Sequence, residues 1–121
     1  MKHVFSVVAV GLAAFFVVEF FTGRIDSKPL AAVAPRIGMD AHDLDAMVPR
    51  ISSKSGATIG TSSRVVYLLA CSGMPTAQTM EAQALQAAGI TERRRMTARE
   101  ATAFVLSGSG GENVPSRLKD C

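Results

Sequence analysis

The feature that most limits how this chain can fold is an apolar run over residues 4–21, VFSVVAVGLAAFFVVEFF, in which Glu19 is the one ionisable side chain. A helix rises about 1.5 Å per residue, so a run of this length just spans a hydrocarbon layer roughly 30 Å thick. The run shows no polar stripe, unlike a helix that packs on the surface of a globular core. Residues 1–21 are therefore predicted to form an N-terminal transmembrane anchor.

A secretory signal is the alternative for the same residues, because a short basic start at Lys2 followed by an apolar run is typical of such signals. The A-x-A pattern nearest to the run, at residues 32–34, lies far downstream and is followed by Pro35. These features favour a retained anchor over cleavage. If the segment is cleaved, the mature protein is a secreted or periplasmic factor.

Charges around the run give two opposing indications of membrane orientation. Arg24, Lys28 and Arg36 outnumber Lys2, which favours a cytoplasmic C-terminus. A short tail before an anchor, followed by a long domain, is instead typical of an exported domain. We expect the second arrangement: a single-pass protein of the bacterial inner membrane, with residues 4–21 in the bilayer and the C-terminal domain in the periplasm.

The chain has two cysteines, Cys71 and Cys121. In an oxidising compartment they can form one disulfide, which closes a loop of about 50 residues and is worth about 4 kcal/mol in the loop-entropy description. The alternative is a buried thiol at Cys71 and a free thiol at Cys121. No His/Cys grouping has the spacing of a metal site, so no metal and no cofactor are expected.

The rest of the chain divides by composition into a linker over residues 22–39, a short helix with a Ser/Gly-rich loop over 40–63, and a small domain over 64–121. Asp40 is placed to cap the short helix, which Pro49 ends or bends. The linker expectation rests on its prolines and glycines and its lack of periodicity.

Residues 64–121 predict a reduced α/β domain in β-α-β-α order. The unbroken apolar run at 64–70 (RVVYLLA) indicates a strand covered on both faces. Strong helix formers follow over 77–88 and end at Gly89, and 90–96 (ITERRRM) is expected to be an exposed edge strand. A Thr97–Glu100 capping box then opens a second helix.

Residues 65–90, VVYLLACSGMPTAQTMEAQALQAAGI, resemble the opening of a glutaredoxin-like or small thioredoxin-like domain. In that family a buried strand enters a C-P-x-C turn, and the turn opens a helix that ends at a Gly-Ile or Gly-Val pair. The resemblance implies a cis peptide bond before Pro115, in the Val-Pro pair that packs beside the redox turn. The residues that occupy the redox turn here are Met74, Pro75, Thr76 and Ala77.

Both redox cysteines of that family are missing, because Met74 and Ala77 stand in their places, so thiol exchange through this turn is impossible. Six residues follow Pro115, too few for the closing strands and last helix of the family. The resemblance therefore implies a truncated, redox-inactive module that binds a protein partner.

One charge cluster is a candidate binding surface, and it consists of Arg93, Arg94, Arg95 and Arg99. It can dock an acidic partner, or it can protect an exposed edge strand by charge alone. Nucleic acid is not expected as a partner, because no aromatic platform accompanies these arginines. No small-molecule substrate is evident.

The sequence shows no convergent nucleophile, base and electrophile, so we expect no enzymatic activity. The predicted function is a membrane-anchored, extracytoplasmic binding module, serving as an accessory or assembly subunit of a larger bacterial membrane complex. The thioredoxin-like module and the secreted factor are the two alternatives.

Overall fold

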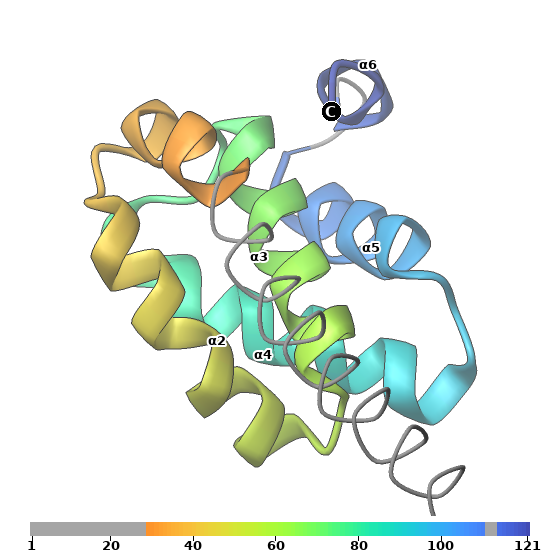
Figure 1. Cartoon of the computed structure of the whole chain (residues 1–121). Coiled ribbons are helices and arrows are strands. Elements are labelled where there is room, and N and C mark those ends of the chain that lie inside the picture. Colours follow the sequence, from red (N-terminus) through yellow and green to blue (C-terminus); the bar gives the residue numbers. More distant parts are fainter. Residues whose placement is uncertain (1–28, 111–113) are drawn as a thin grey trace, which may run out of the picture.

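The computed structural model describes residues 29–110 and 114–121, and the structural statements below refer to these residues. Residues 29–33 are helical and lead into the 3-10 helix η1 (Ala34–Ile37) (Figure 1). The helices that follow are α2 (Ala41–Ser55), α3 (Ile59–Ser72), α4 (Ala77–Arg94), α5 (Ala98–Gly110) and α6 (Val114–Lys119). No strand occurs in the described part of the chain, which is all-α.

Helix α3 lies at the centre of the fold, between α2 and α5 and in front of α4 in Figure 1. It contacts η1 and each of the helices α2, α4, α5 and α6. These neighbours bury most of its residues from Val65 on, which can therefore be apolar, while Ile59, Gly60 and Arg64 in its first turns are exposed. Its buried residues are Ser62, Val65, Val66, Leu68, Leu69, Ala70, Cys71 and Ser72.

The strand predicted at residues 64–70 is wrong, because this apolar run lies inside the 14-residue helix α3. An unbroken apolar run fits a buried strand and a buried helix equally well, and length decides between them. The length of this helix was not evident from the sequence, because the helix begins with a mainly polar stretch. The Thr58 hydroxyl accepts a hydrogen bond from the Thr61 backbone N–H at 3.1 Å, so the helix begins within the expected Ser/Gly loop.

The edge strand predicted at residues 90–96 is also wrong, because α4 continues through Gly89 to Arg94. Gly89 is buried in mid-helix, where a Cβ atom would lie 2.8 Å from the Arg93 Nη1. The glycine thus leaves room for the Arg93 side chain to lie along the helix. Arg95 ends the helix in the left-handed conformation, with φ 58°. Because the described residues contain no sheet, the predicted α/β fold class is wrong and a thioredoxin-like domain is not supported.

The predicted N-terminal ends of two helices are confirmed. Helix α4 begins at Ala77, and α5 begins at Ala98. The Thr97–Glu100 capping box is formed: the Glu100 N–H donates to Thr97 Oγ1 at 3.0 Å, and the Thr97 N–H donates to Glu100 Oε1 at 2.9 Å. Helix starts were predictable because a cap is a local signal.

Residues 29–39, predicted as part of a linker, belong to the folded domain. Leu30, Val33 and Ala34 are buried in its core. Helix α2 likewise exceeds its predicted length, because it passes through the exposed Pro49 and ends at Ser55. Proline removes one backbone hydrogen bond there without ending the helix.

No helix within 29–110 or 114–121 has the length and apolar character needed to cross a bilayer. The predicted transmembrane helix, the single-pass inner-membrane placement and the periplasmic placement that followed from it therefore find no support among the described helices. Residues 4–21, on which those expectations were based, lie outside the described residues.

Helices α2 and α4 are joined on their outer side by an ion-pair group. Arg50 donates to both carboxylate oxygens of Glu81, from Nε at 3.3 Å and from Nη2 at 3.0 Å, and Lys54 Nζ lies 3.7 Å from Glu81 Oε2. The hydrogen bond from Arg50 is the main reason why the pKa of Glu81 is lowered. Exposed pairs of this kind contribute little to stability but fix the relative position of two helices.

Replacing Arg95 by glycine should stabilise the fold, because Arg95 holds a left-handed backbone that glycine adopts without a steric penalty. We expect a gain of about 1 kcal/mol in the free energy of unfolding by urea. The control is Glu92→Gly, an exposed position inside α4, which should lose about 1 kcal/mol. A loss at Arg95→Gly would contradict the assigned helix end.

Glu81→Gln should remove a pH-dependent part of the stability. The folded-state pKa of Glu81 lies below its ordinary value of 4.5, so this stability is present above about pH 4.5 and is lost as the pH falls through the lowered pKa. Urea midpoints of the unsubstituted chain and the variant should differ at pH 7 and converge at pH 3. Glu92→Gln is the control, and an equal difference at both pH values would contradict the assignment.

Candidate functional site

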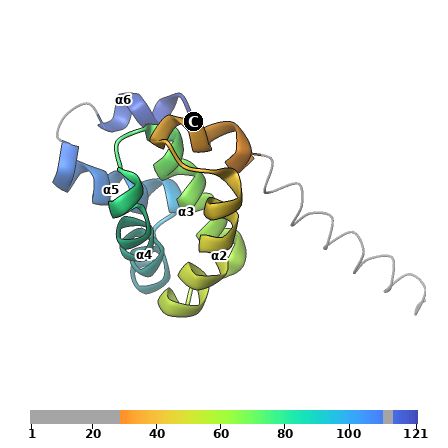
Figure 2. The ribbon, with the colours of Figure 1, turned by 90° about the vertical axis from the view of Figure 1, so that its left-hand side faces the viewer.

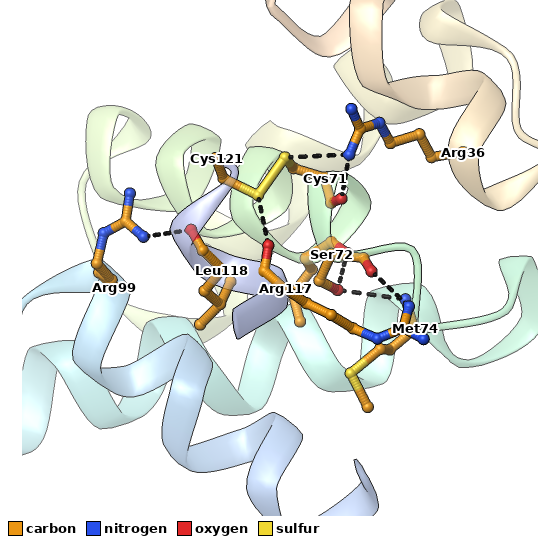
Figure 3. The surroundings of a disulfide bond; sticks show 9 residues. Arg36, Cys71, Ser72, Met74, Arg99, Arg117, Leu118 and Cys121 are labelled. Atoms are coloured by element: carbon orange, nitrogen blue, oxygen red, sulfur yellow. Dashed lines mark hydrogen bonds between the residues drawn. A yellow bond between two sulfur atoms is a disulfide. The ribbon is translucent and has the colours of Figure 1, made fainter. Parts of the chain in front are cut away.

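The covalent feature of the fold is a disulfide between Cys71 and Cys121, which are 50 residues apart in the sequence (Figure 3). Cys71 lies in the last turn of α3 and is 4% exposed, while Cys121 lies just beyond α6 and is partly exposed. Their Cα atoms are 5.9 Å apart. The bond ties the C-terminal residues to the end of the central helix, and Figure 2 shows α6 across that end of the molecule.

Three arginines from different segments surround this disulfide, as Figure 3 shows. Arg36, from η1, donates to the Cys71 carbonyl at 2.8 Å, and Arg117, from α6, donates to the Ser72 carbonyl at 3.2 Å. Arg99, from α5, donates to the Leu118 carbonyl at 2.6 Å. The last carbonyls of a helix have no partner within the helix and carry its negative end, so cationic donors are favourable there.

We call residues 114–121 the C-terminal clasp. Its helix α6 has six residues, far fewer than the roughly 12 to 15 needed for a helix to be stable alone. Contacts with the body of the domain therefore hold it: the disulfide, the buried Leu118 and the bonds of Arg99 and Arg117. The disulfide attaches the clasp covalently and, by restricting the unfolded chain, adds about 4 kcal/mol to the stability of the domain, while burial of a leucine contributes about 2 kcal/mol.

Arg36 makes a second contact at the disulfide. Its Nη1 lies 3.7 Å from Cys71 Sγ, in addition to its bond to the Cys71 carbonyl. The positive charge is therefore next to the sulfur that lies at the negative end of α3. When the disulfide is opened, this cation offsets part of the cost of a thiolate at Cys71, which burial and the negative end of α3 both disfavour.

The residues that resemble a redox turn serve as a helix start. Met74 and Pro75 lie between α3 and α4, and Ala77 is the first residue of α4. The Thr76 hydroxyl accepts from the Thr79 N–H at 3.3 Å, and the Thr76 N–H donates to Thr79 Oγ1 at 3.0 Å, which forms a capping box. This local capping accounts for the polar pattern of the turn without any redox chemistry.

The cis peptide bond that the resemblance implied at Val114–Pro115 is not found. No described peptide bond is cis, and Pro115 lies in the first turn of α6. Proline is well suited to that position, because the first N–H groups of a helix have no partner within it.

The predicted arginine cluster lies at the corner between α4 and α5. Arg93 and Arg94 complete the last turn of α4, Arg95 is its C-cap, and all three are exposed. Arg99 is separated from them in function, because its guanidinium is bonded to α6. Basic residues in the last turn of a helix also stabilise that helix through its dipole.

An exposed aromatic side chain accompanies these arginines. Phe104, in α5, is 50% exposed, and the Arg94 guanidinium carbon lies 6.0 Å from the centre of its ring. We call Arg93, Arg94, Arg95 and Phe104 the α4–α5 corner. It is an exposed cationic corner with one aromatic side chain beside Arg94, not the charged edge strand that the sequence suggested.

Sequence reasoning missed three residues of these two sites: Arg36, Arg117 and Phe104. Arg36 and Arg117 reach the disulfide through tertiary contacts, across 35 and 45 residues respectively, and no local pattern indicates them. Phe104 could have been suspected, since it is one of two aromatics after residue 21, the other being Tyr67.

A further surface depression, with a volume of about 270 Å³, lies beside the first turns of α3. The Arg64 guanidinium lies 5.7 Å from the centre of the Tyr67 ring there, and Gly60 leaves backbone open to the depression. Its lining residues are Pro29, Gly60, Ser63, Arg64 and Tyr67. They offer one cation and two hydroxyls, and they lie next to the first described residue.

The acidic residues near the start of α2 form no metal centre. Asp40 stands at the N-cap position, but its side chain makes no capping hydrogen bond, and Asp43 lies in the first turn. Within the described ranges, no group of three or more His, Cys, Asp and Glu side chains could hold a metal ion.

Comparison of the chain with models of protein families, with curated proteins and with solved structures finds no match. No family therefore supplies a fold relative or a site pattern, and the resemblance to glutaredoxins gains no support from a relative. Function has to be argued from the disulfide and the α4–α5 corner themselves.

Removing the disulfide should test how far the clasp stabilises the domain. For Cys71→Ala/Cys121→Ala we expect a loss of about 4 kcal/mol in the free energy of unfolding by urea, without a reductant, because the unfolded chain is no longer closed over 50 residues. Addition of dithiothreitol should bring the unsubstituted chain to the same midpoint and leave the variant unchanged. Equal midpoints for the oxidised chain and the variant would contradict a bond between these cysteines.

Proposed function

We propose that this chain is a non-enzymatic binding protein that docks onto an acidic surface of a protein partner through the α4–α5 corner. The observation that carries the proposal is the exposed run of Arg93, Arg94 and Arg95, in which Arg94 lies over the ring of Phe104, a side chain that is 50% exposed. Arginine and aromatic side chains are the types most enriched at the energetic centres of protein interfaces.

The charge at this corner is available to a partner. Within the described residues the ion pairs involve Arg50 and Lys54 with Glu81, and none involves the arginines of the corner. The neighbouring Glu100 carboxylate is bonded to the Thr97 N–H, where it caps α5. Guanidinium groups bind an incoming carboxylate in bidentate geometry, and among the described residues no carboxylate is paired with those of the corner.

An acidic protein surface fits this corner better than nucleic acid does. A nucleic-acid site needs cations spread along a phosphate backbone and, for single strands, several aromatic platforms. The corner is compact and has one aromatic ring, and the whole chain carries a net charge of only +3. A compact cationic patch with one aromatic side chain fits carboxylates set beside an apolar side chain.

The test uses charge reversal at the corner and a matched control elsewhere. Arg93→Glu/Arg95→Glu changes the charge by the same amount as Arg64→Glu/Lys119→Glu, whose positions lie on α3 and α6. The probe is a fluorescein-labelled peptide of alternating Glu and Leu, measured by fluorescence anisotropy at 50 mM and 150 mM salt.

We expect the unsubstituted chain and the control to bind the peptide, more weakly at the higher salt, and the corner variant to lose at least tenfold in affinity, which is about 1.4 kcal/mol. A peptide in which Lys replaces Glu should not bind. Equal losses in both variants would show that binding depends on net charge alone, and tighter binding of duplex DNA than of the peptide would overturn the choice of partner.

A further inference from the structure

We propose that the Cys71–Cys121 disulfide is a thiol–disulfide exchange site, at which a dithiol reductant attacks Cys121, Cys71 leaves beside Arg36, and the C-terminal clasp is released. The proposal is independent of the α4–α5 corner and of its partner. It rests on three observations: the unequal exposure of the two sulfur-bearing residues, the position of Arg36, and the weak attachment of α6 without the covalent bond.

The difference in exposure between the two cysteines determines which sulfur is attacked. Cys71 is 4% exposed at the end of the central helix, whereas Cys121 is partly exposed beyond α6. An incoming thiolate must approach one sulfur in line with the sulfur–sulfur bond, so attack is expected at the sulfur of the more exposed residue, Cys121. The bond to Cys71 Sγ then breaks, and the electron pair leaves with that sulfur.

Arg36 assists the departure of Cys71. Its Nη1 lies 3.7 Å from Cys71 Sγ and is held in place by the 2.8 Å bond to the Cys71 carbonyl. Exchange is faster when the leaving thiol is the more acidic one, and a neighbouring guanidinium stabilises the thiolate that forms. Arg36 is thus a positioning residue for the leaving sulfur.

The reaction is balanced by the second thiol of the reductant. The first thiol forms a mixed disulfide with Cys121, and the second attacks that bond and releases Cys121 as a thiolate. The reductant becomes a disulfide, the protein gains two electrons, and both cysteine thiolates take up protons from water according to their acidity.

The clasp is released because few contacts hold it once the disulfide is open. After reduction, residues 114–121 are held by the buried Leu118 and by the bonds of Arg99 and Arg117 to two backbone carbonyls. A six-residue helix does not persist without tertiary contacts, and ordering its eight-residue segment costs conformational entropy at every residue. Opening the bond therefore frees the C-terminus and uncovers the site of Leu118.

The experiment measures the rate and the site of exchange in the full-length oxidised chain. Dithiothreitol is added, samples are quenched in acid, and free thiols are alkylated and counted by mass spectrometry. Arg36→Met should slow the second-order rate of reduction about threefold or more, and Arg36→Lys should restore most of it. Arg117→Met is the control, because it removes a guanidinium near the disulfide without a sulfur contact, and it should not slow the reaction.

Two further measurements keep the proposal falsifiable if Arg36→Met folds poorly. Brief treatment of the unsubstituted chain with glutathione should place the mixed disulfide on Cys121. Hydrogen exchange of the reduced chain should show loss of protection over 114–121, with protection retained in α3 and α4. Glutathione found on Cys71 would contradict attack at Cys121. Unchanged or faster reduction of Arg36→Met would contradict the role of Arg36. A clasp that stays protected after reduction would contradict its release.

Discussion

Near-complete burial of α3 from Val65 to Ser72 is the condition on which the other elements depend. Its leucines and valines each contribute about 1.5–3 kcal/mol when fully removed from water, and no single neighbour can cover them all. Helices α2, α4 and α5 supply most of this cover, while η1 and α6 complete it at the end of α3 that carries Cys71. The other helices are therefore packed around one apolar helix, α3.

That end of α3 shows how a core with few large side chains is completed. Its last carbonyls need donors, and guanidinium groups from η1 and α6 provide them, while a third guanidinium from α5 bonds to α6. Long arginine side chains can reach such carbonyls and keep part of their charge in water. The disulfide then fixes covalently what these bonds position.

Features that depend on contacts within one turn could be predicted from the sequence, whereas features that depend on tertiary packing could not. The capping box at Thr97–Glu100 and the start of α4 at Ala77 follow from contacts within one turn, so a reader of the sequence can find them. The run at 64–70 could not be assigned in the same way, because complete burial removes the polar face by which a helix is recognised. Gly89 misled for a related reason: it is buried inside α4 beside the Arg93 side chain and does not end a helix.

The same distinction applies to the candidate sites. The number of cysteines and an oxidising compartment indicate that Cys71 and Cys121 can pair. The arginines at 93–95 are recognised as a cluster because they are adjacent in the sequence. Which arginines touch the disulfide depends on the fold, since Arg36 and Arg117 approach it from opposite directions along the chain. Arg99, placed with its neighbours by sequence alone, proves to belong to the clasp.

The position of the clasp has a consequence for how the protein is made. Cys71 is synthesised 50 residues before its partner, and at roughly 5–20 residues per second the ribosome needs some seconds to reach Cys121. During that interval Cys71 has no cysteine partner within the chain, so a disulfide that it forms then joins it to another molecule. The helices packed around α3 gain only non-covalent contacts until Cys121 is available.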